Sequence, residues 1–306
     1  MHGAPRLGTR GSPLAMAQAR EVAAAIVAAR SWPAGRVEIV PITTSGDRVK
    51  DRPLADVGGK GLWTKELDLA LLAGEIDFAV HSVKDVEVVR PDTIRLAAVR
   101  PRTHVTDTLV GAAGIGELRE GAVVGTSSPR RKAQLLAARP DLVVVTLRGN
   151  VETRLRKLAD GEADATVLSA AGLHRLGLDH VGTPIPFDLM LPAPGQGAIG
   201  IECRANDAHT LALLEAIDDP ASHRAVSAER AFARALGGSC HSPVAALATV
   251  EGPTVYLAGE ILSEDGAERV RDEASFDSGD EEQAARLALA MLARAPETVR
   301  RLFATA

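Results

Sequence analysis

Short apolar runs alternate with longer segments rich in alanine and leucine along residues 6–202. The apolar runs are bounded by turn residues and predict strands at 6–9, 37–43, 93–99, 122–126, 142–147 and 165–168, with another beginning at Ile76. The segments between them predict helices at 13–30, 62–73, 130–139 and 151–159. Strands that alternate with helices are typical of doubly wound sheets with parallel strands, so the pattern predicts an α/β fold.

A repeated motif divides this part of the chain into two similar lobes. Gly8-Thr9 followed by Ser12-Pro13 matches Gly125-Thr126 followed by Ser128-Pro129. In both copies the serine is expected to cap a helix and the proline to occupy its first position. The free N–H groups and the positive dipole end of each helix N-terminus then form an anion site, and we expect the two sites to face a shared cleft.

The pattern changes after these lobes. A Pro/Gly-rich crossing at 191–197 precedes a strand at 198–202 that is expected to return to the first lobe. A helix from about Ser222 to Leu236, a meander at 244–250, 254–262 and 268–276, and a closing helix from about Asp280 then predict a small α+β domain. The expected domains are 1–99 with 200–218, then 103–194, and finally 222–306.

Composition is that of an ordinary globular protein, with 46% hydrophobic and 25% charged residues in 306. No apolar run is long enough to span a bilayer, and the first ten residues lack the apolar stretch of a signal peptide. We therefore expect a cytoplasmic location. Cys203 and Cys240 have no CxxC spacing, so neither a metal site nor a disulfide framework is indicated.

Charge is unevenly distributed along the chain. The net charge of -5 argues against a nucleic-acid-binding protein, yet residues 130–157 hold eight basic and two acidic residues, a local charge of +6. Arg10 and Ser12 stand at the first helix N-terminus; the residues expected around the second are Thr126, Ser127, Ser128, Arg130, Arg131, Arg148 and Arg154. A solvated face is the alternative for any one arginine, and we prefer it for Arg139 and Arg156. Clustered arginines indicate a ligand with several carboxylates or phosphates.

Lys84 and Asp85 stand where the strand that begins at Ile76 would leave its sheet. In open α/β sheets, ligands bind beyond the carboxyl ends of strands, so this pair lies where chemistry is usually done. A structural ion pair is the alternative. The polar, glycine-containing loop at 44–61 is long for a compact domain and suggests a lid or binding segment.

Cys240 follows two glycines and a serine on a loop, where its thiol would be accessible. Such a thiol could be a nucleophile, a regulatory group or an attachment point for a covalent group. Adjacent residues on a strand point to opposite faces, which weakens a pairing with His241; a distant base such as His81 is the alternative, although a structural role suits His81 equally well. Cys203 lies in an apolar run and is expected to be buried and inert.

These motifs together resemble the porphobilinogen deaminase (hydroxymethylbilane synthase) family over nearly the whole chain. The segments that carry the resemblance are Gly8 to Ala15, Val57 to Leu62, His81 to Val86, Gly125 to Arg131, Leu147 to Val151, Pro194 to Ala198 and the loop around Cys240. The resemblance implies two lobes like those of type II periplasmic binding proteins and a small α+β C-terminal domain. It also implies a dipyrromethane cofactor bound covalently to Cys240.

The implied activity joins four porphobilinogen molecules one by one, with release of ammonia, into the linear tetrapyrrole hydroxymethylbilane. Asp85 would stabilise the azafulvenium cation left when ammonia departs and would help to shuttle protons, while Lys84 would hold a cofactor carboxylate. The residues implied to bind cofactor or substrate are Arg10, Ser12, Lys60, Ser82, Lys84, Thr126, Ser127, Ser128, Arg130, Arg131, Arg148, Arg154, Arg175 and Gln196. The implied protein is a monomer that binds neither nucleic acid nor membrane, and its product would pass to uroporphyrinogen-III synthase.

The chain departs from the family pattern at a few positions. Gly11 stands where a larger polar residue is common, and Trp63 replaces the usual phenylalanine. Ser45 replaces a frequent arginine, Glu87 a frequent proline and Ser239 a glycine. Only the change at Ser45 removes a charge, which puts a substrate-binding role for that position in doubt.

Two other classes of function are compatible with parts of this pattern. Hinged lobes with exposed helix N-termini also describe non-catalytic anion-binding modules, but the chain lacks an export signal and a helix-turn-helix segment. A hydrolase or acyltransferase that uses Cys240 as nucleophile is the third hypothesis. Native alkylation distinguishes it, because a sulfur that carries a cofactor would be blocked.

Overall fold

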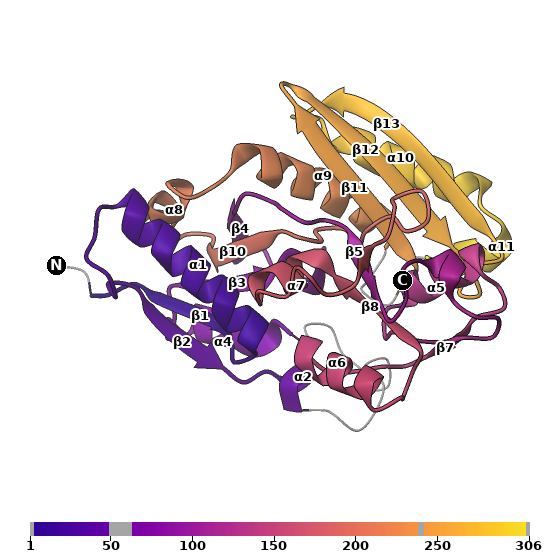
Figure 1. The fold of residues 1–306 in the computed structure, drawn as a ribbon. Helices are drawn as coiled ribbons and strands as arrows, with labels where there is room; N and C mark the ends of the chain where they lie inside the picture. Colours follow the sequence, from indigo (N-terminus) through magenta and orange to yellow (C-terminus); the bar gives the residue numbers. More distant parts are fainter. Residues whose placement is uncertain (1–2, 49–62, 238–241, 304–306) are drawn as a thin grey trace. The chain divides into compact units, whose positions relative to one another are not determined.

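The computed structural model describes residues 3–48, 63–237 and 242–303, without the side chains of Asp47 and Arg48. The chain forms two compact units. Figure 1 labels the helices and strands of both. The first comprises Met1–Thr103 and Ala198–His223, and the second comprises His104–Gly197 and Arg224–Ala306. Each unit is described by itself below.

The first unit is built on a five-stranded sheet in the order β2-β1-β3-β10-β4. Its strands are β1 (Arg6–Arg10), β2 (Glu38–Ile42), β3 (Phe78–Ser82), β4 (Ile94–Val99) and β10 (Ile199–Arg204). Its helices are α1 (Pro13–Ala29), α2 (Ser45–Arg48), α4 (Lys65–Leu72), α8 (Ala208–Glu215) and the first residues of α9 (Pro220–Ala235), with a 3₁₀ turn η1 (Val83–Asp85) after β3. These elements lie close to the predicted ones, although α2 and α8 were not predicted.

Helices pack on both faces of this sheet because side chains alternate along its strands. On β3, Phe78 and Val80 join the core formed with α1 and α8, whereas Ala79 packs with α4 on the other face. On β10, Ile201 and Cys203 face the α1 side. The intervening residues, His81 on β3 and Glu202 on β10, therefore belong to the face that carries α4.

The second unit contains a sheet of the same design, in the order β7-β6-β8-β5-β9. Its strands are β5 (Asp107–Val110), β6 (Val123–Gly125), β7 (Val143–Val145), β8 (Ala165–Ser169) and β9 (Thr183–Pro184). The helices are α5 (Pro129–Ala138), α6 (Val151–Ala159) and α7 (Ala170–Arg175), with a 3₁₀ turn η2 (Ile115–Glu117). The shared strand order supports the prediction of two similar α/β lobes.

Neither sheet is wholly parallel, which corrects that part of the prediction. β1, β2 and β3 are parallel, but β10 runs antiparallel to both β3 and β4. The chain reaches β10 at the carboxyl end of β3, where Val83 donates its N–H to Ala198 O (3.1 Å), so the new strand has to run backward. β5 enters in the same way, with Asp107 paired to Ser169 at the carboxyl end of β8.

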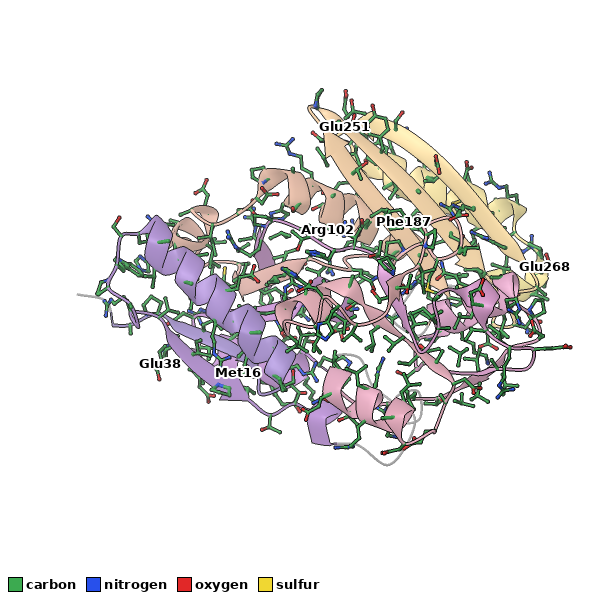
Figure 2. All side chains as sticks on the ribbon, in the orientation of Figure 1. Met16, Glu38, Arg102, Phe187, Glu251 and Glu268 are labelled. Atoms are coloured by element: carbon green, nitrogen blue, oxygen red, sulfur yellow. The ribbon has the colours of Figure 1, made fainter. Side chains whose placement is uncertain are left out.

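The rest of the second unit is the small C-terminal α+β domain that the sequence predicted. It holds α9 (Pro220–Ala235), the antiparallel meander β11 (Val244–Glu251), β12 (Thr254–Leu262) and β13 (Arg269–Asp277), and then α10 (Glu281–Arg294) and α11 (Glu297–Arg300). α9 and α10 pack on the sheet through a core that includes Phe232, Leu257 and Met291. Glu251 and Glu268 mark its two turns, at opposite ends of the sheet (Figure 2). The predicted three-domain boundaries stay a prediction.

Among the described residues, none of the helices combines the length and the apolar character that crossing a bilayer requires.

Candidate functional site

Lys84 and Asp85 lie in the single 3₁₀ turn that follows β3. The turn is closed by the N–H of Val86, which donates to Val83 O (3.0 Å), and Val83 itself is buried. The polar pair is thus placed at the carboxyl end of a central strand, the position that the sequence pattern indicated.

A pocket in the first unit brings four predicted site residues together. Its lining includes Arg10, Ser12, Ser82 and Asp85, and it has an empty volume of about 390 Å³ that includes its open mouth. Residues that the sequence analysis did not place there also line it, namely Leu14, Ala15, Gln18, Trp63, Val80 and His81. A cation and a carboxylate at one pocket form a site with both signs of charge, suited to a zwitterionic ligand.

Trp63 and Gln18 order this pocket. The guanidinium carbon of Arg10 lies 3.9 Å from the centroid of the Trp63 ring, a cation–π contact for which tryptophan is the best partner. Gln18 on α1, which is 2% exposed, donates from Nε2 to Ser82 Oγ (2.8 Å). Ser82 lies on the α1 face of β3 by the same alternation as Val80, which is why a side chain from α1 reaches it.

Ser12 caps α1 as predicted. Its Oγ accepts from the N–H of Ala15 (3.3 Å), and Pro13 occupies the first helical position. A hydroxyl has two acceptor lone pairs and one donor. The cap therefore leaves the O–H of Ser12 able to donate to a ligand.

His81 lines the pocket but is almost completely buried, and it is a poor general base. Burial, and then the positive charge of Arg90, lower its pKa to about 4. Its Nε2 lies 3.4 Å from Glu202 Oε2, and both side chains are almost completely buried. A neutral imidazole in this position supports the structural role that the sequence analysis considered.

Thr126, Ser127 and Ser128 surround the start of α5 in the second unit. Ser128 is the N-cap and accepts from the N–H of Arg131 (3.4 Å), while Thr126 Oγ1 accepts from the N–H of Ser128 (3.2 Å). Ser127 Oγ accepts from Nη2 of Arg154 on α6 (3.3 Å). The predicted N-terminus is therefore present, and its hydroxyl groups already take part in local hydrogen bonds.

Arg130 and Arg131 are placed differently from the expectation of cations that face a ligand. They are 3% and 6% exposed, and both are ion-paired with Asp107, which is fully buried (2.7 and 2.6 Å). Backbone oxygens of Leu191 and Val167 accept further hydrogen bonds from them (both 2.8 Å). The structure thus assigns them a structural ion pair, and direct contact with a ligand stays a prediction.

Gln196 joins this buried cluster. Its Nε2 donates to Asp107 Oδ1 (3.0 Å) and to Val105 O (2.9 Å). The polar residue of the Pro-Gly-Gln-Gly segment therefore holds the crossing to the start of β5. Both contacts are within the protein, so the predicted hydrogen bond from Gln196 to a bound ligand stays a prediction.

Arg148, Arg154 and Arg175 are half-buried, unlike Arg130 and Arg131. Arg154 donates from Nε to Gly149 O (3.0 Å), and Arg175 donates from Nη2 to Gly197 O (2.9 Å). Asn150 caps α6 between them in sequence, as predicted, by accepting from the N–H of Thr153 (2.8 Å). In these contacts Arg154 and Arg175 both donate to backbone carbonyl oxygens.

Two predicted site residues, Lys60 and Cys240, lie outside the described residues. The other cysteine, Cys203, is fully buried in the first unit, and burial raises its pKa to about 11. A thiol in that state is not a nucleophile at neutral pH. The structure therefore agrees with the expectation that Cys203 is inert.

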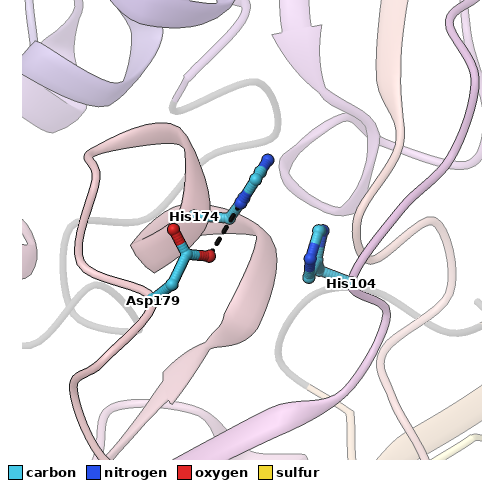
Figure 3. A group of neighbouring side chains, drawn as sticks. All are labelled: His104, His174 and Asp179. Carbon is cyan, nitrogen blue, oxygen red and sulfur yellow. Dashed lines mark hydrogen bonds and ion pairs between the residues drawn. The ribbon is translucent and has the colours of Figure 1, made fainter.

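His104, His174 and Asp179 form an exposed group in the second unit (Figure 3). His174 Nδ1 lies 2.7 Å from Asp179 Oδ1, and its ring stacks on that of His104 with centroids 4.1 Å apart and planes 19° apart. Imidazole lone pairs lie in the ring plane, so two nearly parallel rings do not aim them at one point. The arrangement is a stacked pair with a surface hydrogen bond rather than a preformed metal centre.

The sequence did not reveal the roles of Asp107, Gln18, Arg90 and Glu202. Their buried side chains contact candidate residues or residues next to them in sequence. The available signal was a charged or polar side chain on an otherwise apolar strand, as with Asp107 before Thr108-Leu109-Val110 and Glu202 within Ile199–Arg204. Burial of such a side chain requires a partner. The identity of the partner depends on tertiary packing.

Two family models cover almost the whole chain. Residues 6–212 match "Porphobilinogen deaminase, dipyromethane cofactor binding domain", and residues 223–294 match "Porphobilinogen deaminase, C-terminal domain". Among curated relatives, porphobilinogen deaminase of Sphingopyxis alaskensis is 56% identical over 307 residues, which cover 98% of this chain and 96% of the relative. That of Paracoccus denitrificans is 53% identical and covers 88% of this chain and 87% of the relative.

Solved structures are more distant. A periplasmic substrate-binding protein of an ABC transporter from Coxiella burnetii is 17% identical, with a TM-score of 0.42 over 74% of this chain and 96% of that chain. The score describes a loose similarity only. The family matches and the curated relatives are decisive by themselves: the chain belongs to the porphobilinogen deaminase family.

Proposed function

We propose that the chain is a transferase that condenses four porphobilinogen molecules, one at a time, into the linear tetrapyrrole hydroxymethylbilane. Each condensation breaks the bond between the methylene carbon and the nitrogen of one porphobilinogen and joins that carbon to a ring carbon of the growing chain. The amino group and the ring hydrogen that is lost together make up the ammonia released. Water releases the finished product. The observation that carries the proposal is the pocket in which Asp85, Arg10 and Ser12 line the same space.

Arg10 and Asp85 suit the two charges of porphobilinogen. The substrate carries acetate and propionate carboxylates, which a guanidinium binds bidentately, and an aminomethyl group that leaves as ammonia. The Trp63 ring holds the Arg10 guanidinium from one side at 3.9 Å. The hydroxyl of Ser12 adds a neutral hydrogen bond.

Asp85 is the proposed catalytic residue. Departure of ammonia leaves positive charge delocalised over the pyrrole ring, and a carboxylate fixed at this position stabilises that charge. The same oxygen atoms accept hydrogen bonds from pyrrole N–H groups and take up the ring proton that is lost. The one-turn 3₁₀ helix fixes the backbone of Asp85 before substrate arrives.

The dipyrromethane cofactor supplies the primer on which the chain grows, and its proposed attachment is a thioether to Cys240. The donor set of the described residues fits a group with several carboxylates. The residues proposed to bind those carboxylates are Lys84, Arg148, Arg154 and Arg175, together with the hydroxyl groups of Thr126, Ser127 and Ser128. Arg130, Arg131 and Gln196 would act mainly through their contacts with Asp107, which would position the residues that bind the ligand.

Ser82 and Lys60 complete the proposed surroundings of the reaction. Ser82 keeps its proposed contact with ligand through the hydroxyl that Gln18 orients. Lys60 would contribute a further cation, from a segment that would act as a lid. We further propose a monomer in the cytoplasm that delivers its product to uroporphyrinogen-III synthase.

Turnover of porphobilinogen tests the proposed function. The purified chain, incubated with porphobilinogen, is expected to release four ammonia molecules for each linear tetrapyrrole found by mass spectrometry. Binding without release of ammonia would instead identify an anion-binding module. Rapid alkylation of Cys240 in the native, untreated protein would favour the cysteine-nucleophile class.

A further inference from the structure

Arg90 lies at the centre of a buried charge cluster in the first unit. Its side chain is 10% exposed and makes paired hydrogen bonds with two carboxylates. Nε and Nη2 donate to the two oxygens of Glu202 (2.9 and 2.8 Å), and Nη1 and Nη2 donate to those of Asp68 (3.0 and 2.5 Å). We call Arg90, Asp68 and Glu202, together with Glu87 and Thr64, the Arg90 cluster.

Two weaker contacts complete the cluster. Nη1 of Arg90 lies 3.4 Å from Glu87 Oε2 and 3.5 Å from Thr64 Oγ1. Thr64 in turn donates to Glu87 Oε2 (3.0 Å) and is fully buried. A planar guanidinium can serve several acceptors in fixed directions at once, which an ammonium group cannot do.

The cluster ties together three segments that the sequence separates. Asp68 and Thr64 come from the start of α4, Glu202 comes from the α4 face of β10, and Glu87 and Arg90 follow the turn that holds Asp85. Glu202 is 1% exposed, so its charge depends on Arg90 for compensation. Asp68 is also partly buried, and this burial raises its pKa although its hydrogen bonds to Arg90 act in the opposite direction.

Both ends of the cluster are adjacent in sequence to pocket residues. Trp63 immediately precedes Thr64, and Asp85 precedes Glu87 by two positions. Trp63 and Asp85 both line the pocket, whereas Arg90 does not. The cluster therefore anchors two pocket walls to a central strand without itself reaching the ligand.

We propose that Arg90 is a positioning residue for the reaction: by bridging Asp68, Glu87 and Glu202, it sets the place of Asp85 and Trp63 in the pocket. This inference rests on the proposed function. The proposal also assigns a role to Glu87, which stands where the family frequently has proline: its side chain bonds to Arg90 and Thr64 in the cluster. Positional errors near 1 Å are enough to reduce turnover about 100-fold.

Three variants of the holoenzyme test the positioning role. Arg90→Leu removes the bridge, Arg90→Lys keeps its charge without its forked geometry, and Arg95→Leu is the matched control, an exposed arginine on β4. We expect kcat to fall about tenfold or more in both Arg90 variants, with KM within about threefold of wild type. The control should retain both constants.

Arg90→Lys decides the question if Arg90→Leu does not fold, because the ammonium still compensates the buried carboxylates. Wild-type kcat in Arg90→Lys, or a change in KM alone, would overturn the positioning role. A merely structural role would lower the unfolding temperature and leave kcat unchanged in the molecules that are folded. Activity is therefore measured per folded, cofactor-loaded molecule, well below each unfolding temperature.

Tryptophan fluorescence gives a readout that does not depend on activity. The chain has two tryptophans, so a Trp32→Phe background leaves Trp63 as the reporter of the pocket wall. We expect Arg90→Lys to increase quenching of Trp63 by acrylamide, and Arg95→Leu to leave it unchanged. Unchanged quenching in Arg90→Lys would overturn the link to Trp63.

Different results would contradict the proposed function and the positioning role of Arg90. If the wild-type holoenzyme did not convert porphobilinogen, the proposed function would fail, and quenching of Trp63 would still test the anchoring. If the wild type turned over and both Arg90 variants matched it, the positioning role alone would fail.

Discussion

The guanidinium of Arg10 lies 3.9 Å from the centre of the Trp63 ring, and both residues line the pocket that Asp85 also lines. Arg10 ends β1 and Trp63 precedes α4, so two separate elements of the first unit fix one cation. The contact holds the charge in place before a carboxylate arrives, which reduces the entropy lost on binding.

Trp63→Ala should therefore weaken substrate binding. A cation–π contact contributes about 0.5–2 kcal/mol, so KM for porphobilinogen should rise roughly 2- to 30-fold. Trp63→Phe keeps an aromatic face and should show a smaller rise. Steady-state kinetics of both variants checks this, and equal KM values for wild type and Trp63→Ala would contradict it.

Asp85→Asn should fold and still bind porphobilinogen but lose nearly all turnover. The amide keeps the size of the side chain and removes both the negative charge and the proton acceptor, a loss of about 100- to 10,000-fold. Asp92→Asn, an exposed aspartate in the same unit, is the control. Ammonia release is the measurement, and a near-normal rate in Asp85→Asn would remove Asp85 from its central role.

Asp107→Asn should destabilise the second unit strongly. Arg130 and Arg131 would remain buried without their shared carboxylate, and breaking a buried ion pair costs about 3–5 kcal/mol. The matched control is Asp141→Asn, because Asp141 pairs with Arg139 near the surface and the unfolding midpoint should move little. Urea unfolding compares the two, and similar small shifts would show that the buried pair is dispensable.

Sequence reasoning predicted most elements because their signals are local. Ser12, Ser128 and Asn150 cap helices as expected, and the charged pair after the run from Ile76 lies at the end of β3. β5 was not predicted, and the direction of β10 was not predictable in this way, since it depends on where the chain re-enters the sheet. The ion pair of Arg130 and Arg131 was hidden for the same reason: Asp107 lies 23 and 24 positions away from them.

Stability should fall as the pH is lowered, partly because of His81. Its pKa is about 4 in the folded protein and 6.5 when unperturbed, so between these values the unfolded chain binds the additional proton. This contribution is complete above pH 6.5 and is lost as the pH falls toward 4. The charged groups around His81 are Arg90, Asp68, Asp85, Glu87 and Glu202.

His81→Gln removes this linkage. Between pH 6.5 and 5, the free energy of unfolding of the wild type should decrease by about 2 kcal/mol more than that of the variant. Asp68 has the opposite sign, because its raised pKa favours protonation in the folded state at low pH. Urea unfolding at several pH values measures the difference, and identical pH dependence in the two proteins would show that His81 does not stay neutral.

The intact mass of the denatured, purified protein, followed by peptide mapping across Cys240, tests the central claim most directly. We expect an added mass equal to two linked pyrrole units, confined to the peptide that contains Cys240. If Cys240 is unmodified, incubation with porphobilinogen should add this group and start turnover. A Cys240 that stays unmodified in the presence of porphobilinogen, with no release of ammonia, would contradict the account.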